Sequence, residues 1–198
     1  MKNLQVNKKI FIALFFFLIS IKNSKAQQGG NIFLGYGVAS SRSIEDVITD
    51  IFAATTTGGN YKVTDSKYSG AIFGGYRTFV SRKTELAGTF VYERASKDIA
   101  SDTEQYDKIT SNTYAVLAGL KYNYINRPSF RLHSGLDAGI AFTKNSTAVK
   151  IVLDSDKETN FAYQIDAIGL SYGRKLSFSL NVGYGFKGIA NLVLAHKL

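Results

Sequence analysis

The chain has 198 residues, a formal net charge of +9 and no cysteine. Without cysteine it can have neither a disulfide framework nor the lipidated cysteine of a bacterial lipoprotein. A pI near 9.6 would suit a nucleic-acid-binding protein, but no basic run is longer than Arg82-Lys83 or Arg174-Lys175, and we expect no nucleic-acid partner. Many tyrosines, phenylalanines and glycines with a single proline favour an all-β domain, because aromatic residues fit pleated surfaces.

Residues 1–26 have the pattern of a secretory signal peptide. Three lysines precede an apolar run over 10–21, and we expect cleavage after Ala26. The run is shorter than the roughly 20 residues that a membrane-spanning helix needs. Its removal takes away five lysines and no acid, which leaves 19 basic and 15 acidic residues in 27–198. That segment has the length of one domain.

Alternation of bulky apolar residues with small or polar ones predicts eight strands. In the clearest segment, Leu180 and Val182 share one face, while Ser179 and Gly183 share the other. Most segments have about the 9–11 residues that a tilted strand needs to cross a membrane. In chain order, the predicted strands cover 31–39, 69–79, 84–94, 114–124, 130–142, 161–172, 176–186 and 188–198, with a β-bulge near Ala167.

The predicted connections alternate between short and long. Tight turns are expected at 80–83, 126–128, 173–174 and 186–188, and long loops at 40–68, 95–109 and 143–160. Short turns at one end and longer loops at the other are typical of outer-membrane barrels, whose longer loops lie outside the cell. The predicted fold is therefore an eight-stranded antiparallel up-and-down transmembrane β-barrel, with a short amphipathic helix in its first long loop.

Aromatic residues are expected in two girdles, because rings with polar edges prefer the two membrane interfaces. The group near the long loops is Tyr92, Tyr114, Phe142, Phe161, Tyr163, Tyr184 and Phe186, and the group near the short turns is Tyr122, Tyr124, Phe130, Tyr172 and Phe178.

The residues on the polar strand faces favour a membrane barrel over a soluble barrel that binds an apolar ligand inside. Glycines are abundant there, which suits the narrow interior of a small barrel. Charges of both signs are also present, and they must pair if they are buried. The predicted lumen network is Arg77, Glu85, Glu93, Lys121, Arg131, His133, Asp137, Gln164 and Asp166. We expect a filled interior without an open pore.

Helical spacing in the first long loop predicts an amphipathic helix of about three turns. Its apolar residues are Ile44, Val47, Ile48, Ile51 and Phe52. Ser43 and Asp46 resemble a capping box at the start, and Gly58-Gly59 would end the stretch. The apolar face could cover the barrel mouth as a lid, lie at the outer membrane interface, or dock a partner protein.

No catalytic or metal-binding arrangement is recognisable in the sequence. The two histidines are far apart: His133 belongs to the polar face, and His196 to the apolar face of the last strand. Neither has a second histidine three to five residues away, and no cysteine is present. We expect no catalytic residue, no metal and no cofactor.

The strand Asn31-Ile32-Phe33-Leu34-Gly35-Tyr36-Gly37 and the hairpin from Val182 to Ile189 carry Gly-aromatic patterns. With them, the chain resembles the small outer-membrane β-barrel proteins of Bacteroidetes-type bacteria, similar in architecture to OmpX and the OmpA membrane domain. The resemblance implies an eight-stranded barrel in the outer membrane of a Gram-negative bacterium.

The expected role is structural, adhesive or partner-binding, and not catalytic. The expected partners are outer-membrane lipids and lipopolysaccharide, the barrel assembly machinery during biogenesis, and a protein partner at the loops. The alternatives are a lipid-modifying outer-membrane enzyme and a soluble periplasmic barrel that binds a hydrophobic ligand.

Overall fold

The computed structural model describes residues 29–56, 62–100, 106–148 and 153–198. The signal peptide expected over 1–26 lies outside the described residues. The elements are β1 (Asn31–Val38), α2 (Ser41–Thr56), β2 (Lys62–Phe79), β3 (Thr84–Ala100), β4 (Tyr106–Asn126), β5 (Phe130–Ala148), β6 (Leu153–Gly173), β7 (Leu176–Gly185) and β8 (Ala190–Lys197).

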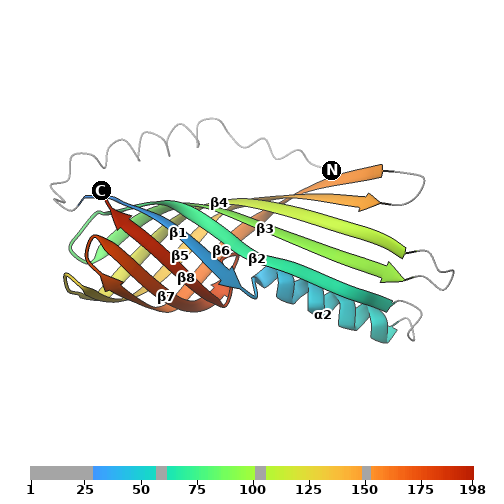
Figure 1. The fold of residues 1–198 in the computed structure, drawn as a ribbon, viewed down its shortest axis with the longest axis horizontal. Helices are drawn as coiled ribbons and strands as arrows, with labels where there is room; N and C mark the ends of the chain where they lie inside the picture. Colours follow the sequence, from blue (N-terminus) through green and yellow to red (C-terminus); the bar gives the residue numbers. More distant parts are fainter. Residues whose placement is uncertain (1–28, 57–61, 101–105, 149–152) are drawn as a thin grey trace.

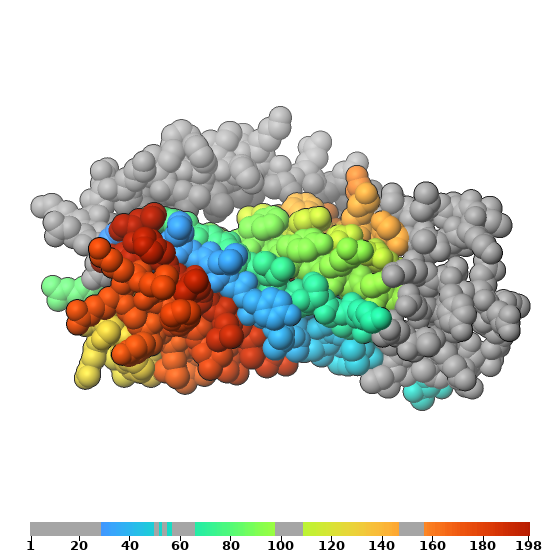
Figure 2. Space-filling view, in the orientation of Figure 1, coloured from blue at the N-terminus to red at the C-terminus, as the bar shows by residue number. Residues whose placement is uncertain are grey.

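The eight strands close into one antiparallel barrel, as the sequence predicts. Each strand pairs with the next, and β1 pairs with β8. Figure 2 shows β1 (blue) packed between β8 (red) and β2 (green). The predicted bulge near Ala167 is confirmed, because the register of β6 against β7 shifts between Asp166 and Ile168.

Strands β2 to β6 are much longer than predicted, with 17 to 21 residues each. Most of the residues assigned to long loops at 95–109 and 143–160 continue the strands instead, and β2 already begins at Lys62. The alternation ends where both strand faces become polar, although backbone pairing continues. In Figure 1 these five strands project beyond the ends of β1, β7 and β8.

The bulky apolar residues of the strands point outward, and polar residues point inward. Leu34 and Leu192 are each 62% exposed, while Asn181 and Asn191 are at most 2% exposed. Aromatic rings gather at both ends of the outer face. At the long-strand end, the ring centres of Tyr92 and Tyr114 are 5.1 Å apart. At the short-turn end, the ring centres of Tyr122 and Tyr124 are 5.4 Å apart.

The interior is layered and not uniformly polar. An apolar layer of Phe73, Val91, Ala115, Leu117 and Ala141 lies inside the barrel. The strand register shows what lies on each side of this layer. Glu93 and Thr113 lie on the side of the long strands, and the charged residues lie on the side of the short turns. The prediction of a polar, salt-bridged interior is therefore only part of the structure, because inward-facing apolar side chains also fill the lumen.

Helix α2 is longer than predicted and starts earlier. Its first turn is capped by Ser40, whose Oγ accepts a hydrogen bond from the backbone N–H of Ser43 at 3.1 Å. The predicted start at Ser43 is wrong. Ser40, Ser41 and Ser43 all carry a hydroxyl that can cap a helix, so the sequence does not show which of them does. Ala39, with φ of 54°, turns the chain from β1 into the helix. In the described part of the chain, no helix is long and apolar enough to span a membrane.

Glycines inside the barrel wall allow close backbone approach, which gives a testable contrast within one strand pair. A Cβ added at Gly75 would lie 2.0 Å from the carbonyl oxygen of Gly88, whereas a Cβ at Gly88 would meet nothing within 4 Å. We expect Gly75→Ala to lower the free energy of unfolding by about 1–3 kcal/mol through overpacking, and Gly88→Ala to leave it nearly unchanged. Urea unfolding in lipid vesicles measures both, and equal effects would contradict the register of β2 against β3.

Candidate functional site

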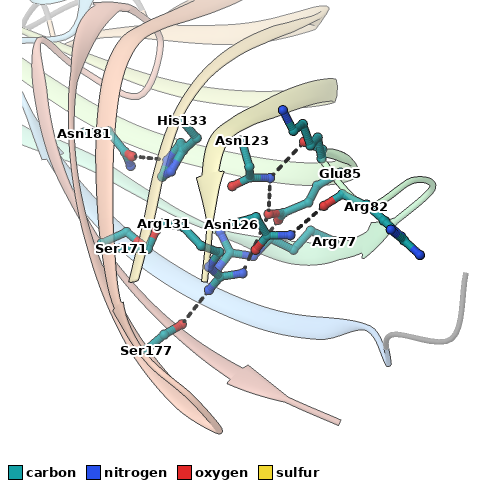
Figure 3. Close-up of polar contacts among 12 residues, drawn as sticks. Arg77, Arg82, Glu85, Asn123, Asn126, Arg131, His133, Ser171, Ser177 and Asn181 are labelled. Atoms are coloured by element: carbon teal, nitrogen blue, oxygen red, sulfur yellow. Dashed lines mark hydrogen bonds and ion pairs between the residues drawn. The ribbon is translucent and has the colours of Figure 1, made fainter. Parts of the chain in front are cut away.

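The first charged cluster lies inside the barrel near the short turns and centres on Glu85. Arg77 Nε is 3.5 Å from Glu85 Oε2, and Arg131 Nη1 is 3.7 Å from Glu85 Oε1. Asn123 donates a hydrogen bond to Glu85 Oε1 at 2.9 Å. Figure 3 shows these side chains converging from β2, β3, β4 and β5, so the cluster ties four strands together across the lumen.

The second charged cluster centres on Lys187, between β7 and β8. Its Nζ lies 2.8 Å from Asp137 Oδ2 and 2.8 Å from Asp166 Oδ2. Gln164 accepts a hydrogen bond from the backbone N–H of Lys187 at 2.7 Å and donates one to Asp166 at 2.9 Å. The tight β7–β8 turn is thus anchored to β5 and β6 from inside the barrel.

Lys187 is not among the predicted lumen residues, because it lies in a turn where strand alternation does not apply. Gly185 and Gly188, with φ of 139° and 93°, give the turn a backbone that other residues adopt with strain. Lys187 therefore points inward and is 7% exposed. The same turn directs Phe186 against the apolar layer, which corrects its predicted place in the outer aromatic girdle.

The predicted lumen residues do not form a single network. Glu93 lies apart from both clusters, where it accepts a hydrogen bond from Ser40 at 2.6 Å. Lys121 lines a cavity of about 30 Å³ together with Arg77, Asp137 and Asp166. That volume holds about one water molecule. This part of the described interior therefore offers no space for an apolar ligand or an open channel.

His133 lies in a polar setting that has no catalytic arrangement among the described residues. Its Nε2 is 2.9 Å from the amide oxygen of Asn181. The amide nitrogen of Asn181 donates a hydrogen bond to the amide oxygen of Asn191 at 2.7 Å. A catalytic histidine needs a nucleophile such as a hydroxyl to activate, and often a carboxylate to orient it. Neither Asn181 nor Asn191 is a nucleophile or a carboxylate. His196 is exposed on the outer face, opposite Ile32 of β1. Within the described ranges, no group of three or more acidic or histidine side chains is placed to hold a metal ion.

Helix α2 turns polar residues toward the barrel and apolar residues away from it. Arg42 donates hydrogen bonds to Thr113 and Thr143 inside the barrel, and Asp46 lies 3.6 Å from Lys97 of β3. The apolar residues point outward instead: Val47, Ile48 and Phe52 are exposed, Ile44 is half-buried, and the side chain of Ile51 lies outside the described ones. The exposed apolar residues Val47, Ile48 and Phe52 therefore do not cover the barrel mouth.

Lys187→Met tests the second charged cluster. The substitution leaves Asp137 and Asp166 buried without their cation, which costs about 3–5 kcal/mol. We expect a lower urea midpoint in lipid vesicles, with partial recovery when Asp166→Asn is added. Lys144→Met removes an exposed lysine of β5 and serves as the control. An unchanged midpoint for Lys187→Met would contradict the ion pairs.

Comparisons with known proteins identify no family for this chain. No family model and no curated protein matches it. Solved structures of small outer-membrane barrels are similar to this chain. Each alignment covers 86% of this chain and 98% of the other chain. The N-terminal β-barrel domain of Pseudomonas aeruginosa OprF is 14% identical, with a TM-score of 0.41. Ail, the attachment invasion locus protein of Yersinia pestis, is similar in two structures. In complex with the heparin analogue sucrose octasulfate it is 15% identical with a TM-score of 0.46. In a second structure it is 16% identical with a TM-score of 0.43.

Proposed function

We propose that this chain is a structural barrel of a Gram-negative outer membrane, with a surface-exposed end that binds partners and no catalytic role. The observation that carries the proposal is the inverted burial of the strands. Val116, Leu120 and Leu180 are about half exposed, whereas Ser179 is 2% exposed one residue from Leu180. A contiguous apolar surface of this kind is rare on soluble monomers and suits contact with lipid acyl chains.

The lengths of the strands support a membrane-spanning barrel. β1, β7 and β8 have 8 to 10 residues, close to the roughly 9–11 that a tilted strand needs to cross the hydrocarbon layer. An apolar groove of about 700 Å³ runs over the outer face, with Leu34, Leu170, Leu180 and Leu192 in its lining. In this proposal phospholipid and lipopolysaccharide acyl chains fill the groove, and the barrel assembly machinery inserts the chain.

The extensions of β2 to β6 support a location outside the hydrocarbon layer for that end of the barrel. Their outward residues include Lys67, Arg94, Lys144 and Lys157, all of which are exposed. Charged side chains facing outward are costly within lipid and favourable in water or among sugars. We place this end outside the cell, because outer-membrane barrels carry their longer segments there.

Leu180→Arg tests the membrane location. The substitution puts a charge on the lipid-facing side of β7 and should destabilise the barrel by about 2–4 kcal/mol if that position is near the middle of the bilayer. We expect loss of the heat-modifiable band from the membrane pellet, while Leu180→Met remains folded. A chain that stays in the supernatant, or a Leu180→Arg variant that assembles normally, would contradict the proposal.

The exposed face of α2 supports a second part of the proposal, that the helix docks a partner protein at the cell surface. Val47, Ile48 and Phe52 are apolar and exposed, and Figure 1 shows the helix beside the projecting part of β2. The neighbouring extensions have polar outer faces. An apolar face at this height suits the groove of another protein.

The absence of cysteine in the sequence allows a site-specific test of this docking face. A photoreactive maleimide is attached to Phe52→Cys and, as the control, to Lys144→Cys on intact cells. We expect a protein adduct at 52 only, because burial of the apolar face excludes water from the contact. Adducts at both positions would indicate non-specific contact. If position 52 is instead quenched by lipid-borne nitroxide, the helix lies at the membrane interface and docks no protein.

A further inference from the structure

The exposed charged side chains described at the short-turn end of the barrel are all cationic. The described residues there carry six exposed cations, which are Arg82, Lys83, Arg127, Arg174, Lys175 and Lys197. The acid nearest to them in the strands is Glu85, which is buried and bound to Arg77 and Arg131. The exposed cations thus have no acidic partner among the described ion pairs.

Four of these cations surround a basin of about 750 Å³ at the mouth of the barrel. Arg127, Arg174, Lys175 and Lys197 line it, and Arg131 adds a further guanidinium. They come from three separate turns or strand ends and from β5. No aspartate or glutamate side chain belongs to the lining. The basin is thus a concave surface with converging positive charge, open at the end opposite the helix.

The other end of the barrel shows that the charge pattern is local. There Lys97 lies 3.6 Å from Asp46, and Arg94, Lys144 and Glu158 are exposed on the same group of strands. The described side chains at that end thus carry charges of both signs. At the turn end, by contrast, like charges face a common basin and raise the local concentration of anions. Their repulsion is relieved when an anion binds.

We propose that this basin binds a phosphate-bearing anion. Guanidinium groups match phosphate oxygens with two parallel hydrogen bonds, and several converging cations suit a ligand with more than one negative charge. Lys83 lies 6.0 Å from the ring centre of Tyr122, an exposed residue of the aromatic girdle. Lys83 and Tyr122 do not line the basin, but they belong to the same end of the barrel, which in the proposed membrane location lies at the height of lipid headgroups, next to water. A phospholipid headgroup and a soluble phosphate compound both carry this chemistry.

The test uses the purified full barrel, ¹⁵N-labelled, in zwitterionic detergent at constant ionic strength. Pyrophosphate and short-chain phosphatidylglycerol are titrated separately, with chloride and acetate as controls. We expect saturable amide shifts at Arg127, Arg174, Lys175 and Lys197 with a phosphate probe and not with chloride or acetate. A response to phosphatidylglycerol alone assigns the site to lipid headgroups, a response to pyrophosphate alone assigns it to soluble phosphates, and a response to both supports recognition of the phosphate itself.

Matched double variants separate this site from general charge. R174Q/K175Q and R127Q/K197Q each remove one arginine and one lysine of the basin, and R94Q/K144Q removes the same pair of residue types at the other end. We expect each basin variant to weaken binding of the phosphate probe by about tenfold or more, and the control variant to bind normally. Heat-modifiable mobility checks that each is folded. Equal losses in all three, shifts with chloride of the same size, or no response to either phosphate probe would overturn the proposal.

Discussion

The structure depends on the narrow interior of a closed eight-stranded barrel. Where all eight strands pair in a ring, they satisfy their backbone hydrogen bonds within the sheet and leave no free edge. The ring has room for only one set of side chains inside, which is why glycines such as Gly75 approach the neighbouring backbone closely. Bulky residues such as Leu192 must then point outward. An outward surface of this kind suits an apolar solvent, so barrel closure and the proposed membrane location depend on each other.

The same narrow interior makes each buried charge depend on its partners. Glu85 is shared between two arginines, and Lys187 between two aspartates. Buried ions of this kind are costly without compensation, and each cluster joins strands that are distant in sequence. The apolar layer around Phe73 and Leu117 adds close packing between the charged layer and the opposite end. The barrel is therefore held from inside as well as through its sheet.

The two ends of the barrel have different surfaces. One end carries projecting strands with charges of both signs and a helix whose apolar face is uncovered. The other end has short turns and a basin surrounded by cations such as Arg127 and Lys175. An asymmetric membrane offers different chemistry on its two sides, and in the proposed membrane location the chain would present a different surface to each. The filled charged layer between them separates the two ends.

The sequence by itself determined the strand number, the inward and outward faces, the bulge near Ala167 and most of the buried polar residues. These follow from alternation with a period of two, which is a local property wherever one face is apolar. Only the tertiary structure decided the lengths of β2 to β6, because alternation disappears when both faces are polar. Tertiary structure also decided the direction of the helix face and the pairing of Lys187, a turn residue placed by the backbone of Gly185 and Gly188. Such contacts join residues far apart in the chain, and closure of the barrel brings them together.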